Sequence, residues 1–239
     1  MDVGGTTTDF GVIQQGFPRE SSVAASIGGV RTNFRMPDVI SIGLGGGSIV
    51  HENNSQISVG PDSVGYEITK KAKVFGGDIL TATDIAVRLG MAELGDPQRV
   101  MDIDLNYAKE AMKVIRGMVE EGIDQMKISS QDVDVILVGG GSIIIPEVLE
   151  GTAHVIKPGH FGVANAIGSA ISKVSGTYEQ LVNYDETPRD EMMEEASKLA
   201  IQAGANPDSV EIINVEDVPL AYYPGNTCRL KIKAAGDLI

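Results

Sequence analysis

The sequence predicts an α/β fold, a mixed sheet flanked by helices, followed by a smaller α+β segment. Three observations indicate this fold class. A glycine turn near the N-terminus leads into the β-prone run Phe10–Ile13. Residues 105–125 carry apolar side chains at spacings of three and four, the pattern of an amphipathic helix. Val133–Val138 is a nearly continuous apolar run that opens on Gly139–Ser142, which indicates a central buried strand leading through a glycine turn into a helix.

Shorter signals predict the other elements of this lobe. Thr81 and Asp84 are typical of a helix N-cap before residues 85–94, although the same residues could form a site loop. Pro158 and Gly159 precede a helix at 161–174, whose small residues permit close packing on a sheet or on a bound base. Short strands are expected at 10–16, about 21–27, 39–42, 49–51, 56–59 and 153–157.

A seam at Ser175–Gly176 separates the lobe, residues 1–175, from a C-terminal appendage, residues 176–239. The appendage begins with a strand-like run at 177–184 and an acidic helix at about 187–203. Its further strands are expected at 210–215, 218–223 and 229–235. Cys228 lies beside the last of these strands and is interpreted as a buried, small hydrophobic residue.

Composition narrows the classes of function. The 239 residues carry a formal net charge of −14 and the pI is about 4.6, so the basic footprint needed to bind nucleic acid or an anionic membrane is missing. Cys228 is the only cysteine, which excludes an intrachain disulfide and is typical of a reducing compartment. No apolar run is long enough to span a bilayer. We expect a cytoplasmic protein without nucleic-acid or membrane partners.

The stretch Asp2–Asp9 carries the most chemical information. It holds two carboxylates, two adjacent glycines and three threonine hydroxyls. The glycines permit a tight turn in which backbone N–H groups approach a ligand, and threonine hydroxyls can donate to phosphate oxygens. Asp2 can hold Mg²⁺, directly or through water. The alternative is a plain β-hairpin with a Gly-Gly turn, but such a hairpin needs neither the threonines nor the flanking aspartates.

A second glycine-rich motif, Gly43–Ser48, follows the strand expected at 39–42. Its triple glycine could line a nucleotide site or a substrate site. It could equally be a bulge where backbone packs against backbone. The sequence leaves these alternatives open.

Five motifs occur in order along the chain: Asp2–Asp9, Ile42–Ile49, Gly60–Gly65, Thr81–Asp84 and Val138–Ser142 with Pro146. The first four resemble D-x-G-G-T-[ST]-T-D, I-G-x-G-G-G-S-I, G-P-x-S-A-G and T-x-T-D of the hydantoinase A/5-oxoprolinase family. The last resembles the adenosine motif of the wider sugar kinase/Hsp70/actin superfamily. Asn165–Ala170 is similar to the family's N-A-x-G-x-A. The resemblance covers about residues 1–175 well and the tail less specifically.

The resemblance implies an RNase H-like lobe of the actin-like ATPase type that uses ATP and Mg²⁺. Asp2 would hold the metal, and Asp9 would either orient water or only stabilise the hairpin, so Asp2 and Asp9 are the catalytic candidates. The residues expected to bind the nucleotide are Gly4, Gly5, Thr6, Thr7, Thr8, Gly45, Gly46, Gly47, Ser48, Gly139, Gly140, Gly141 and Ser142.

The resemblance also implies ATP-dependent hydrolysis of a cyclic amide, such as a hydantoin or 5-oxoproline. An amide carbonyl is a poor electrophile, and phosphorylation of its oxygen would allow water to open the ring. Subunits of acetone and acetophenone carboxylases are the first alternative, because they also phosphorylate a carbonyl oxygen. An ATP-binding module without turnover is the second.

The start of the chain suggests that a segment is missing. Only Met1 precedes the Asp2 turn, whereas strands average about five or six residues. In the family, an N-terminal lobe carries another phosphate hairpin. The residues between Asp2–Asp9 and Gly43–Ser48 are too few to form a lobe, so Asp2–Asp9 is expected to be the second phosphate motif. The chain would then require the missing N-terminal lobe, and possibly a second subunit, for activity.

Overall fold

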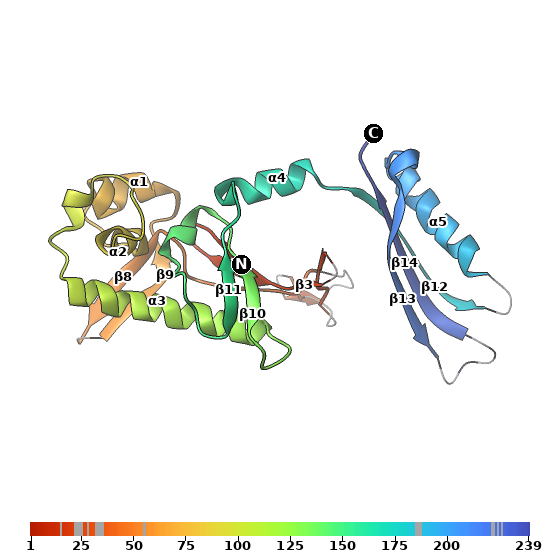
Figure 1. Ribbon diagram of the computed structural model, residues 1–239, viewed down its shortest axis with the longest axis horizontal. Coiled ribbons are helices and arrows are strands. Elements are labelled where there is room, and N and C mark those ends of the chain that lie inside the picture. The colour runs from red at the N-terminus through yellow and green to blue at the C-terminus, as the bar shows by residue number, and fades with distance from the viewer. Residues whose placement is uncertain are drawn as a thin grey trace. The chain divides into compact units, whose positions relative to one another are not determined.

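The computed structural model describes residues 1–14, 16–21, 26–27, 29–31, 36–54, 56–184, 188–220, 223, 225 and 227–239. They form two compact units, Met1–Asn165 and Ala166–Ile239, both drawn in Figure 1. The boundary lies ahead of the predicted seam at Ser175–Gly176, inside the helix predicted at 161–174. That helix is shorter than predicted: α4 spans Ala164–Ala170 and follows a 3₁₀ turn at Phe161–Val163.

The first unit is built on a small mixed sheet. β1 (Asp2–Val3) pairs antiparallel with β2 (Thr8–Gly11), and β2 pairs antiparallel with β7 (Val39–Ile42). β10 (Val133–Ile136) pairs in parallel with β11 (Thr152–Ile156). Val138 joins the two groups through a parallel bridge to Asp2, and the N–H of Val3 donates to the carbonyl of Val138 at 2.9 Å. The strand order is therefore β7-β2-β1-β10-β11, and every strand except β2 runs in the same direction.

β10 differs from its prediction. The apolar run Val133–Val138 predicted a strand buried on both faces, but only alternate residues are covered. Val135 and Leu137 are buried, whereas Ile136 is 47% exposed. Successive side chains of a strand point to opposite faces, so one face of this strand is covered and the other is more exposed. The prediction of a central buried strand is wrong in this respect.

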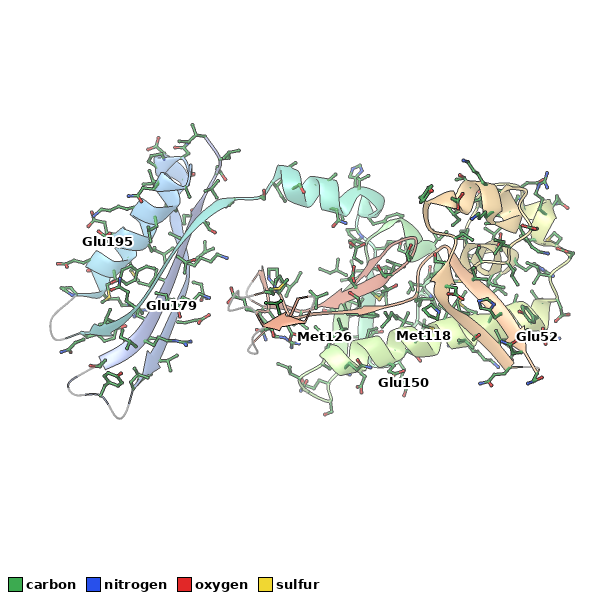
Figure 2. The ribbon with its side chains drawn as sticks, turned by 180° about the vertical axis from the view of Figure 1, so that it is seen from behind. Glu52, Met118, Met126, Glu150, Glu179 and Glu195 are labelled. Atoms are coloured by element: carbon green, nitrogen blue, oxygen red, sulfur yellow. The ribbon has the colours of Figure 1, made fainter. Side chains whose placement is uncertain are left out.

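The long helix α3 (Leu105–Met126) confirms the helix predicted at 105–125. Asp104 caps it by accepting from the N–H groups of Asn106 and Tyr107, both at 2.9 Å. Gly122 lets the helix approach β2, because a Cβ there would lie 2.6 Å from the ring of Phe10. Figure 2 labels Met118 and Met126 on this helix. Met126 belongs to the apolar core of the unit and the partly buried Met118 packs against that core, as expected for core-filling methionines.

α2 (Ala82–Arg88) begins where the N-cap was predicted. The hydroxyl of Thr81 accepts from the N–H of Asp84 and the Asp84 carboxylate accepts from the N–H of Thr81, which is a complete capping box. Asp84 is fully buried and also accepts from the N–H of Val74 at 2.7 Å. The helix therefore starts earlier than the predicted residues 85–94 and ends earlier as well.

The other strands of the first unit are short hairpins. The strands predicted at 49–51 and 56–59 are confirmed as parts of β8 and β9, and the strand predicted at 10–16 is divided between β2 and β3. Of the strand predicted at about 21–27, residues 22–25 lie outside the described part of the chain. The elements not yet named are β3 (Ile13–Gln14), β4 (Phe17–Pro18), β5 (Ser26–Ile27), β6 (Val30–Arg31), β8 (Ser48–Asn53), β9 (Gln56–Ser63) and α1 (Ile68–Lys71).

The second unit is a three-stranded antiparallel sheet with one covering helix. Its order is β12 (Val174–Asn183), β14 (Thr227–Gly236), β13 (Glu211–Pro219). α5 (Arg189–Gln202) buries Met192, Ala196 and Ala200, and Glu195 lies on its exposed side in Figure 2. Of the strand predicted at 218–223, residues 221 and 222 lie outside the described part of the chain. The break predicted between 210–215 and 218–223 is wrong: a single strand, β13, runs through 216–217 because its residues pair continuously with β14 there.

None of the helices in the described ranges is both long and apolar enough to cross a membrane.

Candidate functional site

Four strands of the first unit end at one edge of its sheet, because β1, β7, β10 and β11 run in the same direction. Three glycine-rich segments leave this edge: Gly4–Thr7 after β1, Gly43–Gly47 after β7, and Gly139–Ser142 after β10. In open α/β sheets, ligands bind outside the carboxyl ends of the strands. The structure therefore brings together three motifs that are far apart in the sequence, at the edge where a ligand site is expected.

The three segments touch through their backbones. The N–H of Gly46 donates to the carbonyl of Gly4 at 3.0 Å, and the N–H of Gly47 donates to the carbonyl of Gly5 at 2.7 Å. A Cβ at Gly45 would lie 2.5 Å from the amide nitrogen of Thr6, and a Cβ at Gly141 would lie 2.1 Å from the carbonyl oxygen of Gly4. Any side chain at these two positions would overlap backbone atoms, so glycine is required there.

Gly45–Ser48 supports the Gly4–Thr7 turn from its buried side. All four residues are buried, and the amide of Gly45 donates to the hydroxyl of Ser48 at 2.8 Å. With the donors of Gly46 and Gly47 also used internally, this loop has no amide free for a ligand. Of the alternatives that the sequence left open, the geometry favours backbone packed on backbone and does not support the nucleotide contacts predicted for Gly45, Gly46, Gly47 and Ser48.

The Thr81–Asp84 motif extends this support. The hydroxyl of Thr83, which is 2% exposed, donates to the carbonyl of Gly46 at 2.8 Å, and the N–H of Thr83 donates to the same oxygen at 3.0 Å. The first turn of α2 thus holds the triple-glycine loop in place. The motif therefore caps α2 and also stabilises the triple-glycine loop that supports the site.

The Gly4–Thr7 turn presents its donors outward. The N–H of Gly4 closes the turn by donating to the carbonyl of Thr7 at 2.9 Å. The carbonyl of Gly5 accepts from the N–H of Gly47 at 2.7 Å and from the hydroxyl of Ser63 at 3.2 Å. Gly5, Thr6 and Thr7 are exposed, and their amides and hydroxyls donate to no other described residue. Consecutive free amides of this kind form an anion-binding concavity.

Thr8 differs from the two threonines before it. It is fully buried, and its hydroxyl donates to the carbonyl of Leu44 at 2.7 Å. This bond ties β2 to the segment after β7. The geometry therefore supports a phosphate contact for Thr6 and Thr7, and gives Thr8 a structural role in place of the phosphate contact that was predicted for it.

Two carboxylates lie on the open face of the sheet beside this turn. Asp2 and Asp9 are directly opposite each other in the β1–β2 pair, so their side chains point to the same face. Asp9 accepts a hydrogen bond from the hydroxyl of Ser41 on β7. Asp2 accepts from the side-chain amide of Asn165 at 3.2 Å. The predicted catalytic pair is thus brought together by a single hairpin.

The Gly139–Ser142 segment is divided between the interior and the surface. Gly139 has a φ of 90°, and its N–H donates to the carbonyl of Phe161 at 2.8 Å. Gly141 and Ser142 are buried, and the hydroxyl of Ser142 has no partner among the described residues. Gly140 is exposed, does not have a positive φ, and has open space where a Cβ would lie. Of the four predicted residues, Gly140 is therefore the one best placed to meet a ligand.

The arrangement suits a phosphate group with a hard metal ion. Exposed amides and hydroxyls can accept the anion, and the carboxylates of Asp2 and Asp9 are oxygen ligands of the type that Mg²⁺ prefers. No group of three or more His, Cys, Asp or Glu side chains in the described ranges could form a complete metal cage. Two carboxylates still fit Mg²⁺, because this ion is commonly held by one or two carboxylates together with substrate phosphates.

Comparison with known proteins identifies the family. The family model described as hydantoinase/oxoprolinase matches residues 1–126 of the chain, which is more than half of it. The chain belongs to this family. The sequence matches none of the curated proteins with which it was compared.

Two solved structures share the fold of the chain. The chain is similar to acetone carboxylase, in a nucleotide-free structure from work on ATP-dependent acetone carboxylation, with 18% identity and a TM-score of 0.62. It is also similar to an ATP-dependent caprolactamase from Pseudomonas jessenii, with 17% identity and a TM-score of 0.59. The matches cover 99% and 98% of this chain but only 46% and 45% of those proteins. The hydantoinase/oxoprolinase family member described here therefore spans less than half the length of these structural neighbours.

Two residues near the site were not among the predicted site residues. Asn165 occurs in the N-A-x-G-x-A motif, but nothing in its spacing indicated a contact with Asp2. The ammonium of Lys157 lies 4.3 Å from the centre of the Phe161 ring, and burial lowers the pKa of Lys157. Lys157 follows β11, whose end lies at the same sheet edge. The one signal that could have found it is this position after a parallel strand.

Proposed function

We propose that the chain is the nucleotide-binding part of an enzyme that hydrolyses a cyclic amide, of the hydantoin or 5-oxoproline class, with ATP. One observation carries the proposal. Gly5, Thr6 and Thr7 present free donors at a sheet edge where Asp2 and Asp9 share one face. Family membership supports the same function, and the name of the caprolactamase neighbour denotes an ATP-dependent enzyme acting on a cyclic amide.

The strand order supports the finer fold assignment within this proposal. In the order β7-β2-β1-β10-β11, the strands β7, β2 and β1 form antiparallel pairs, and β10 and β11 run parallel to β1. This arrangement is expected for the RNase H-like lobe of an actin-like ATPase. Such a lobe would form one side of a nucleotide site. The remaining side would come from the N-terminal lobe predicted from the sequence, and the solved neighbours are long enough to contain one.

Each group at the sheet edge has a role in the proposed reaction. Thr6 and Thr7 hold the transferred phosphate through amides and hydroxyls that are already directed outward, so no rearrangement is needed on binding. Asp2 and Asp9 would hold Mg²⁺, which offsets the charge on the phosphates. Gly140 leaves room for the adenosine part. Gly45–Ser48 and Thr83 keep the turn in shape and contact no ligand.

Transfer of the terminal phosphoryl group to the amide oxygen would activate the ring carbon. The amide carbonyl is a weak electrophile because its nitrogen donates electrons to it, and phosphorylation of the oxygen withdraws electrons from the carbon and makes that oxygen a better leaving group. One water then adds to the carbon and the ring C–N bond breaks, which leaves a free amine and an acyl phosphate. A second water hydrolyses the acyl phosphate and releases phosphate. The overall products are the ring-opened acid, ADP and phosphate.

A second function stays within the same chemistry. The acetone carboxylase neighbour is also ATP-dependent, and phosphorylation of a ketone oxygen would use the same phosphate and metal groups. The groups described at the sheet edge serve either substrate. Substrate-dependent ATP hydrolysis separates the two possibilities when the full-length protein, with any partner subunit, is offered hydantoin, 5-oxoproline, or acetone with bicarbonate.

The proposal predicts that Asp2→Asn and Thr6→Val lower the ATP turnover of the full-length protein by about 10²–10³-fold, because each removes a contact to developing charge. Both side chains are on the open side of the sheet edge, so the melting temperature without ligand should hardly change. Gly140→Val should abolish the increase in melting temperature that Mg–ATP causes, a shift that follows RT ln(1 + [L]/Kd).

Thr8→Val is the matched control. It removes a buried donor from the Leu44 carbonyl and should cost about 1–3 kcal/mol of stability. The remaining folded protein should keep its affinity for Mg–ATP. Wild-type turnover in Asp2→Asn and Thr6→Val together with an unchanged Mg–ATP shift in Gly140→Val would reduce this sheet edge to a structural junction.

A further inference from the structure

Asn165 has no part in the function proposed above, although its side chain contacts the carboxylate assigned to the metal. We propose that Asn165 is a positioning residue that sets the orientation of the Asp2 carboxylate toward the metal–nucleotide complex. The inference rests on the proposed nucleotide site. It states that Asn165 contributes to the metal-dependent part of ATP binding at that site.

The Asp2 carboxylate is confined on one side by Gly139. A Cβ at Gly139 would lie 2.3 Å from Oδ1 of Asp2 and 2.3 Å from the carbonyl oxygen of Val3. The absence of a side chain at position 139 makes room for the carboxylate, and the left-handed backbone there, with φ of 90°, suits glycine. The carboxylate therefore cannot move further toward the Gly139 turn without meeting its backbone.

Asn165 contacts the other carboxylate oxygen. Its side-chain nitrogen donates to Oδ2 of Asp2 at 3.2 Å, across 163 positions in the sequence. An ionised carboxylate can only accept hydrogen bonds, so the amide must present its N–H₂ group. Aspartate at position 165 would have nearly the same shape but would place a second negative charge against Asp2.

The segment that carries Asn165 is attached to the same Gly139 turn. The carbonyl of Phe161 accepts from the N–H of Gly139 at 2.8 Å, and the carbonyl of His160 accepts from the N–H of Val163 at 2.9 Å. His160 has a φ of 61°, which reverses the chain just before the 3₁₀ turn Phe161–Val163. The Gly139 turn thus limits the movement of the Asp2 carboxylate directly. It also holds the start of the segment whose Asn165 side chain contacts that carboxylate.

Contacts on both carboxylate oxygens reduce the orientations open to a partly exposed side chain. Without Asn165, ordering Asp2 on metal binding would cost additional conformational entropy and lose a charge-assisted hydrogen bond. Among the described residues, no hydrogen bond joins Asn165 to Gly5, Thr6 or Thr7, so its removal should affect the metal-dependent part of nucleotide binding and not the phosphate donors.

The test measures ATP affinity of the full-length protein by calorimetry, with Mg²⁺ and with EDTA. Asn165→Ala should weaken Mg–ATP binding by about tenfold, the size of one hydrogen bond to a charged group, and leave metal-free ATP binding within about twofold. Binding of Mn²⁺ in the presence of ADP, followed by electron paramagnetic resonance, should weaken in parallel. Asn106→Ala, at an exposed position on α3, is the matched control and should behave as wild type.

Two further variants keep the inference open to contradiction. Asn165→Asp preserves the shape and removes the donor, so it should fail to restore Mg–ATP affinity. In an Asp2→Ala background, Asn165→Ala should have no additional effect, because its target is gone. Equal weakening with and without metal, unchanged Mg–ATP affinity in Asn165→Ala, or restored affinity in Asn165→Asp would each overturn the positioning role. If wild-type protein bound ATP under neither condition, the proposed function would fail first and this inference with it.

Discussion

The two units reach close packing by different means. At the sheet edge of the first unit, backbone meets backbone: Gly4, Gly46 and Gly141 approach one another with no side chain between them. In the second unit, α5 covers a sheet through side chains such as Met192, Leu230 and Ile232, all 1% exposed or less. This backbone packing has a consequence for the proposed ligand site. When loop backbones support one another, the amides of Gly5–Thr7 can stay free for a ligand.

Polar groups show the same contrast. Asp2 and Asp9 lie on an open face, where a ligand can replace water around them. In the second unit, Tyr184 donates to Asp217 at 2.6 Å, next to the buried Cys228. Burial raises the pKa of the Cys228 thiol, and burial followed by the bond to Asp217 raises the pKa of Tyr184. These groups are held in their neutral forms, which favours packing over reactivity.

The largest loss of stability is expected when one methyl group is added to the first unit. Gly141→Ala would place a Cβ 2.1 Å from the carbonyl oxygen of Gly4, where the neighbour is backbone and cannot rotate away. We expect the first unit to lose more than about 3 kcal/mol of stability, measured by urea unfolding followed by circular dichroism. Gly140→Ala adds the same methyl group into open space and should unfold like wild type. Similar unfolding curves for the two variants would contradict the backbone-packing account.

An intermediate effect is expected from removing methyl groups in the second unit. Ile232 is fully buried between the sheet and α5, so Ile232→Ala should destabilise this unit by about 2–5 kcal/mol through lost burial and a residual cavity. The first unit and its response to Mg–ATP should not change. Val218→Ala, at a residue that is 45% exposed on the same sheet, is the control. A cost for Val218→Ala equal to that for Ile232→Ala would show that the sheet is not packed as described.

The smallest change in stability is expected in the second unit when the pH is raised. The folded pKa of Cys228 is raised, so its contribution to stability is fully present below the unfolded thiol pKa of about 8.5 and is lost as pH rises through the folded value. The stability of the second unit, measured by urea unfolding, should therefore fall above about pH 8.5. Cys228→Ala should flatten this part of the profile of stability against pH.

Alkylation of the native Cys228 thiol at neutral pH should be at least about tenfold slower than in urea. Equal alkylation rates would show that the thiol is accessible.

The sequence predicted local features well because short-range energetics determine them. The capping box at Thr81 and Asp84, the periodicity of α3 and the strand at 39–42 depend on residues within a few positions of one another. The family motifs were also local, and the family is confirmed. The prediction failed at β13, where two short strands were expected, because pairing with β14 continues through 216–217 regardless of local propensity.

By itself the sequence determined which segments turn, which begin helices and which family the chain belongs to. Only the tertiary structure decided which of several similar residues face a ligand. Thr6 and Thr7 are exposed while Thr8 is buried, and Gly140 is open while Gly141 touches Gly4. Gly45–Ser48 lies behind the site, and Asn165 reaches Asp2 from a distant segment. The physical reason is that exposure and partner choice depend on which distant segments share an edge of the sheet, and neighbouring residues in a turn point in different directions.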